Sequence, residues 1–192
     1  MKFINISDDE FKIINHQNKI INDFICHYLS YKKLHSKRDE LKGEKGFWVH
    51  TLNAHIMVSC SYWCMIFGSE KNNDLHWKNL SFNLNKDQNG FENKLLKELS
   101  ISQDEWGKVR KSIMTFRNKY IAHRDIEYRE PVPYLENAYK AIMIYSDWLR
   151  EDILRFSDIL TFGANLEQIA SLHENMINQT LSHLVIDNPL PN

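Results

Sequence analysis

The segment SQDEWGKVRKSIMTFRNKY, residues 102–120, decides the fold class of this chain. Ser102 and Glu105 have the spacing of a capping box, which predicts that a helix begins here. Large apolar side chains then recur at alternating steps of three and four residues, the spacing that places them on one face of an α-helix. They are Trp106, Val109, Ile113, Phe116 and Tyr120. A seam of this regularity is typical of a helix in a bundle.

The same periodicity predicts further helices on both sides of this segment. Ser7 and Glu10 repeat the capping-box spacing at the start of the first one. Pro131 and Pro133 exclude a regular helix after the central segment, because proline lacks a backbone N–H. The remaining helices are expected at about residues 7–38, 47–67, 77–80, 90–99, 134–156 and 165–184.

Alternating β patterns do not occur in the sequence, so we expect an all-α fold: a bundle of four or more long helices with short extra helices. The 192 residues are enough for one domain with a continuous core, expected over residues 1–184, followed by a loose tail at 185–192. Only 6 Gly and 4 Pro are present, fewer than the turns of a sandwich or barrel require.

Charge is distributed unevenly along the chain. The formal net charge of −1 gives no overall attraction to nucleic acid. Residues 106–130 nevertheless hold seven Lys and Arg against three Asp and Glu, an excess of four positive charges. Such a run is either a solvated helix face or a surface that binds an anion.

Several classes of site are not indicated. Three cysteines without a CxxC pair fit neither a disulfide framework nor a zinc site, and Cys60 and Cys64, one helical turn apart, are expected in the core. HExxH spacing and glycine-rich phosphate loops are missing, so we expect no metal and no other cofactor. The sequence has neither a signal-peptide pattern nor an apolar run long enough to span a bilayer. A cytoplasmic protein without membrane contact is the expectation.

The segment FRNKYIAHRD, residues 116–125, carries the candidate chemistry. It holds Arg117, Asn118 and His123 at the end of the strongest amphipathic helix. Cleavage of RNA without a metal needs a group that takes or gives a proton and a cation that stabilises charge on the phosphate. Imidazole suits the first role, and guanidinium suits the second because it binds phosphate oxygens in a fork. Arg117 and His123 are therefore the candidate catalytic pair, with Asn118 to orient the phosphate or the histidine.

The pattern R-N-x-x-x-A-H at the end of a bundle helix resembles the ribonuclease motif of the HEPN superfamily. The blocks SYWCMIFGS (residues 61–69) and LHWKNL (residues 75–80) are similar to those of abortive-infection HEPN proteins, and the resemblance covers about residues 50–150. It implies a HEPN-like fold and a metal-independent endoribonuclease of a toxin–antitoxin or phage-defence system, with single-stranded RNA as substrate and 2′,3′-cyclic phosphate ends on the products. It also implies a homodimer with a shared cleft, and an antitoxin is a further expected partner.

Geometry limits how the motif can work. In an unbroken helix, Arg117 and His123 would stand about 120° apart around the axis and about 9 Å apart along it. Either the helix ends near Ile121, so that His123 swings back, or the site combines residues from two protomers. The neighbouring residues expected to contact RNA, through its backbone or by stacking on a base, are Lys111, Lys119, Tyr120 and Arg124.

Other interpretations remain open at this point. His123 also continues the apolar seam three residues after Tyr120, where a histidine is commonly a packed core residue. The alternative function is a non-catalytic HEPN-like module that pairs with a nucleotidyltransferase, an antitoxin or a nucleic acid, and a helical dimerisation domain without a site is a third. Elsewhere, His55 is expected in the core and His76 at the edge of a cleft.

Overall fold

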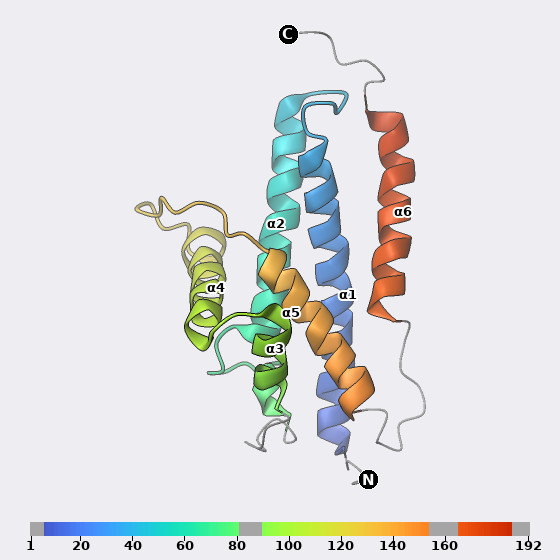
Figure 1. Ribbon diagram of the computed structural model, residues 1–192. Helices are drawn as coiled ribbons and strands as arrows, with labels where there is room; N and C mark the ends of the chain where they lie inside the picture. Colours follow the sequence, from blue (N-terminus) through green and yellow to red (C-terminus); the bar gives the residue numbers. More distant parts are fainter. Residues whose placement is uncertain (1–5, 81–89, 154–164, 186–192) are drawn as a thin grey trace.

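The computed structural model of the chain, shown in Figure 1, describes residues 6–80, 90–153 and 165–185. Regular secondary structure within these ranges is helical, and strand-like pairing is limited there to one isolated bridge between Leu41 and Val185. The expected all-α helical bundle is therefore confirmed. Its α-helices are α1 (Asp8–Ser36), α2 (Lys45–Phe67), α3 (Phe91–Leu99), α4 (Gln103–Phe116), α5 (Glu136–Asp147) and α6 (Leu166–Leu184).

Three shorter helical elements complete the described chain. The 3-10 helix η1 (Trp77–Asn79) precedes α3, whereas η3 (Arg117–Ala122) and η4 (Trp148–Ile153) are π-helices that directly extend α4 and α5. The sequence predicts one uninterrupted helix at each of the last two places. The α-helical parts are shorter than predicted, because both helices change their hydrogen-bond pattern before they end. Residues 154–156 of the predicted helix and residues 186–192 of the predicted tail lie outside the described ranges.

Helices α1 and α4 begin at the two predicted capping boxes. The Ser7 hydroxyl accepts a hydrogen bond from the Glu10 N–H (3.3 Å), and the Glu10 carboxylate accepts one from the Ser7 N–H (3.0 Å). Ser102 and Glu105 make the same two bonds at the start of α4, at 3.2 and 2.7 Å. Each box satisfies backbone N–H groups that have no partner inside the helix.

The long helices α1 and α2 are antiparallel and form the axis of the bundle in Figure 1. Helix α6 runs along another side of α1, and α5 crosses α1 obliquely. Helix α4 packs against α2, and its extension η3 stays in contact with α2. The candidate motif therefore lies beside α2, at the margin of the bundle.

An aromatic cluster joins four helices in the centre of the bundle. It consists of Trp63 and Phe67 from α2, Phe91 from α3, Trp106 from α4 and Tyr145 from α5, all nearly or fully buried. The ring centres of Phe91 and Tyr145 are 4.9 Å apart and those of Phe67 and Tyr145 are 5.4 Å apart, both edge to face. Aromatic pairs in this arrangement stabilise a fold beyond the apolar area they bury. The cluster therefore fixes α4 relative to the rest of the bundle.

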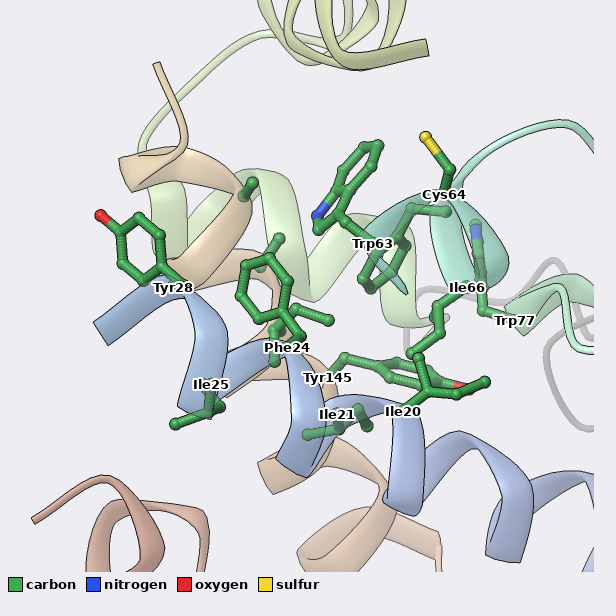
Figure 2. Packing of buried hydrophobic residues seen from close by; sticks show 14 of the residues in the cluster. Ile20, Ile21, Phe24, Ile25, Tyr28, Trp63, Cys64, Ile66, Trp77 and Tyr145 are labelled. Atoms are coloured by element: carbon green, nitrogen blue, oxygen red, sulfur yellow. The ribbon is translucent and has the colours of Figure 1, made fainter. Parts of the chain in front are cut away.

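A buried polar link ties α5 to α1 beside this cluster. The Tyr145 hydroxyl donates to the Gln17 side-chain oxygen (2.8 Å), and the Gln17 amide donates to the Leu75 carbonyl oxygen (3.0 Å). Figure 2 shows Tyr145 in the core beside α1, in the same cluster as Ile20 and Ile21. Both polar side chains are fully buried, and these hydrogen bonds offset the free-energy cost of removing them from water.

Helix α2 holds Cys60, Cys64 and His55, the three residues that the sequence predicts in the core. Cys60 and Cys64 are buried and unpaired with each other, as predicted. His55 is only half-buried, and its Nδ1 lies 3.0 Å from Nδ1 of His27 on α1. The expectation of a core residue is therefore correct only in part: His55 lies at the border between α1 and α2, and the residue after it, Ile56, is buried.

His76 does not lie at the edge of a cleft, because its side chain is fully buried. Its Nδ1 accepts a hydrogen bond from the Lys78 N–H (3.3 Å) and caps η1. Burial lowers the pKa of His76 to about 4; Glu70 raises it, and the nearby charges of Arg110 and Lys78 lower it further. The cap requires a ring nitrogen that can accept, so the folded protein holds His76 in its neutral form.

This burial predicts a loss of stability in acid. Between about pH 6.5 and pH 4 the unfolded chain binds a proton on residue 76 that the folded chain does not bind, so the free energy of unfolding falls as the pH decreases through that range. The loss from this one group amounts to about 2–3 kcal/mol. Urea unfolding at several pH values measures it.

The matched variants are His76→Asn, whose side chain can still accept at the start of η1, and His50→Asn on the exposed surface of α2. We expect His76→Asn to lose less stability between pH 7 and pH 4 than wild type, and His50→Asn to behave as wild type. Equal pH dependence in all three proteins would contradict the assignment.

Candidate functional site

The helix that bears the motif widens where the motif begins. Regular α-helix ends at Phe116, and Arg117–Ala122 continue it as the π-helix η3. The His123 N–H donates to the Asn118 carbonyl oxygen (3.1 Å), five residues back rather than four. A π-turn holds more residues than an α-turn, so every side chain after it is rotated relative to the seam that precedes it. Such turns are frequent at functional sites.

His123 leaves the apolar seam as a result. Ile113 and Phe116 are buried, whereas His123 is exposed. In the part of the chain that the structure describes, its imidazole has no hydrogen-bond or ion-pair partner. The interpretation of His123 as a packed core residue is therefore wrong, and the reason is the π-turn, which a constant helical period does not anticipate.

Arg117 and Asn118 occupy the half-buried side of the same turn. The Arg117 guanidinium lies close enough to the Cys64 thiol of α2 to lower its pKa, although burial, the larger effect, raises that pKa. The guanidinium is thus directed toward α2. Among the described residues, no side-chain hydrogen bond or ion pair joins Arg117, Asn118 and His123. Arg117 and Asn118 begin η3 and His123 follows its last residue, and a direct hydrogen bond between their side chains is not formed in the described chain.

The end of η3 is closed by an unusual residue. Arg124 has a left-handed backbone conformation (φ +48°), which costs a residue with a side chain roughly 1–2 kcal/mol. The next N–H, of Asp125, donates to the Lys119 carbonyl oxygen (2.6 Å), as in the caps that end helices with glycine. The Asp125 carboxylate accepts from the Glu127 N–H (3.0 Å) and pairs with the Lys119 ammonium (3.4 Å). These bonds, that of the Glu127 N–H first, lower the pKa of Asp125.

Aromatic rings support the turn from inside. The rings of Phe116 and Tyr120 are stacked with centres 5.0 Å apart and planes 15° apart. The Arg124 guanidinium lies over the Tyr120 ring, 4.5 Å from its centre. Tyr128, from the segment that follows, approaches both rings at 6.3 and 6.2 Å. The cation–π contact is worth about 0.5–1 kcal/mol at an exposed position and offsets part of the backbone strain at Arg124.

The cations of residues 106–130 do not form one uniform face. Arg110 donates to the carbonyl oxygens of Phe67 (3.0 Å) and Gly68 (2.8 Å), so it fastens α4 to the end of α2. Arg129 donates to carbonyl oxygens of its own loop. Sequence reasoning missed this structural role of Arg110, because its partners at the end of α2 are about forty residues away in the sequence. The cations expected to contact RNA are placed at the surface: Lys111 and Arg124 are exposed, and Lys119 is exposed beside Asp125.

The described residues do not bring together three or more His, Cys, Asp or Glu side chains in an arrangement that could hold a metal ion. None of the helices in the same ranges has the length and apolar character needed to cross a membrane. Comparison of the chain with protein-family models, curated proteins and solved structures gives no match. The site is therefore defined by its own geometry: the exposed imidazole of His123, the guanidinium of Arg117 beside Cys64 and the guanidinium of Arg124 over Tyr120, on η3 and the two residues that follow it.

Exposure of His123 predicts that its removal leaves the fold intact. His123→Ala should change the free energy of unfolding by less than about 0.5 kcal/mol, because a surface side chain without partners contributes little. Ile113→Ala, one of the buried seam positions on α4, should cost about 2–5 kcal/mol. Urea unfolding followed by tryptophan fluorescence measures both. A loss for His123→Ala as large as that for Ile113→Ala would mean that the imidazole is packed.

Proposed function

We propose that this chain is a metal-independent endoribonuclease of the HEPN type, acting on single-stranded RNA in a toxin–antitoxin or phage-defence setting. The observation that carries the proposal is the exposed imidazole of His123 at the end of the π-helix that begins with Arg117. Among the described residues this imidazole has no hydrogen-bond or ion-pair partner. A histidine kept for packing would be buried and hydrogen-bonded. A histidine that exchanges protons with a substrate has to be accessible.

The chemistry assigns a role to each side chain of the motif. The ribose 2′-hydroxyl loses its proton to a base, and its oxygen attacks the phosphorus. The bond from phosphorus to the 5′-oxygen breaks, and that oxygen takes up a proton. This leaves a 2′,3′-cyclic phosphate and a 5′-hydroxyl. His123 would take or give one of these protons, and Arg117 would stabilise the charge on the phosphate oxygens. Asn118, one residue after Arg117, would orient the phosphate or the imidazole.

The surrounding charge supports an anionic substrate. Lys111 and Arg124 are exposed, and Lys119 lies at the rim of the turn with Asp125 beside it. Cations at such positions bind phosphates without reading sequence. The alternative of a non-catalytic HEPN-like module makes use of the same surface, and it differs in that no product forms at any protein concentration.

The proposal predicts cleavage that depends on His123 and needs no metal. Purified wild-type protein, incubated in EDTA with total RNA or a tRNA pool, should give fragments with cyclic phosphate ends. His123→Ala should slow cleavage by about 10²–10⁴-fold, the usual contribution of a general acid or base. Arg117→Ala should slow it by about 10²–10³-fold, as the loss of one charge-stabilising group does. Gel analysis and end-group chemistry of the products measure both.

His50→Ala is the matched control, because it removes another exposed histidine, on α2. It should cleave as wild type does. Cleavage by His123→Ala at the wild-type rate would refute the catalytic role, and RNA binding without products by every variant would favour the binding module.

A homodimer with a shared cleft is part of the proposal. It is supported by the lack of a direct contact between the Arg117 and His123 side chains in the described chain, since a second copy can supply the missing partner. If each site takes Arg117 from one protomer and His123 from the other, mixing Arg117→Ala with His123→Ala protein should restore part of the cleavage. Each mixed dimer would then hold one intact site. Two inactive proteins that stay inactive after mixing and exchange of subunits would show that both residues act within one protomer.

A further inference from the structure

Three side chains of the segment that bears the motif lie against one another: Phe116, Tyr120 and Arg124. The Phe116 ring lies against the Tyr120 ring, and the Arg124 guanidinium lies over the Tyr120 ring. Phe116 precedes Tyr120 by four residues and Arg124 follows it by four, so Tyr120 has a contact from each direction along the chain. Tyr120 is the residue that the sequence suggests for stacking on a base. In the folded chain its ring is already in contact with Phe116 and Arg124.

Arg124 is the outer layer of this stack. Its side chain is exposed, and within the described ranges it forms neither a hydrogen bond nor an ion pair. Its neighbour Lys119, in contrast, is paired with Asp125. The backbone at Arg124 is left-handed, and its guanidinium lies over the Tyr120 ring. A flat, delocalised cation therefore lies over the Tyr120 ring while the Arg124 side chain stays exposed to solvent.

We propose that the exposed guanidinium of Arg124 receives an unpaired nucleobase of the RNA, next to the phosphate that is cleaved. This inference rests on the proposed function and adds that the RNA substrate must have an unpaired base beside the scissile phosphate. Guanidinium planes stack on exposed bases, as aromatic rings do. Phe116 and Tyr120 behind Arg124 keep the plane in place, so that little mobility is lost when a base arrives.

The arrangement has a consequence for specificity. Every base has a π-face, so a stacking platform selects for an unpaired base and not for a particular sequence. In a duplex the base faces are covered by their neighbours, and the platform has nothing to bind. Arg124 thus accounts for a preference for single-stranded RNA, whereas Lys111 contributes charge that either form of RNA can use.

A double-mutant cycle between protein and RNA tests the inference. The protein is the full chain carrying His123→Ala, so that bound RNA is not cut, with and without Arg124→Lys, which keeps the charge and removes the plane. The probes are a short fluorescein-labelled single-stranded RNA and a strand of equal length and charge whose nucleotides are abasic. Fluorescence anisotropy in EDTA gives the four dissociation constants. Arg38→Lys, at an exposed position after α1, is the matched control.

We expect Arg124→Lys to weaken binding of the ordinary strand by about 5- to 150-fold, the usual effect of losing one stacked base. The same substitution should change binding of the abasic strand less than about twofold, because the charge is kept. Arg38→Lys should change neither. Equal losses on both strands would make Arg124 a phosphate contact and overturn the inference, while cleavage by the wild-type protein would still support the proposed function.

Unchanged binding of both strands by Arg124→Lys would overturn the inference in the same way. If neither strand binds to any of the proteins, the proposal of an RNA substrate falls, and the inference falls with it.

Discussion

The contact of the Trp106 ring with the Trp63 and Phe67 rings holds α4 in its place, and the position of the candidate site depends on it. Arg110, one turn further along α4, donates to two carbonyl oxygens at the end of α2 and fixes the same pair of helices from the outside. Together an apolar and a polar interaction set the rotation of α4 about its axis. Once this rotation is set, the buried positions of α4 are determined as far as Phe116.

After Phe116, the π-turn determines which side chains are buried and which are exposed. The bond from the His123 N–H to the Asn118 carbonyl oxygen closes a wider ring than an α-turn does, and it removes His123 from the buried seam. Arg117, at the start of the turn, remains directed toward Cys64 on α2. The same short segment thereby offers one side chain to the interior and one to solvent. Strain at Arg124 accompanies this change of direction, as is common at sites that bind or react.

The cations in this region have two different roles. Arg110 and Arg129 satisfy backbone carbonyl oxygens, so their contribution is to the fold. Lys111 and Arg124 are exposed and remain free to meet an anion. The net charge of the chain is close to zero, so attraction to RNA would be local to this end of α4. A local field of this kind is screened within about 8–10 Å at physiological salt, which confines it to a substrate already at the site.

The sequence by itself determined the helices, because capping boxes, prolines and a three-and-four apolar spacing act over a few residues. Ser7 and Ser102 begin helices as predicted, and Trp106, Ile113 and Phe116 of the predicted seam are buried. It also located the segment that holds Arg117, Asn118 and His123. Only the tertiary structure decided that His123 is exposed, that His76 is buried and that Arg124 covers Tyr120. These outcomes depend on whether a backbone N–H donates to the carbonyl oxygen four or five residues earlier, or on contacts with side chains that are distant in the sequence. A local sequence pattern contains neither kind of information.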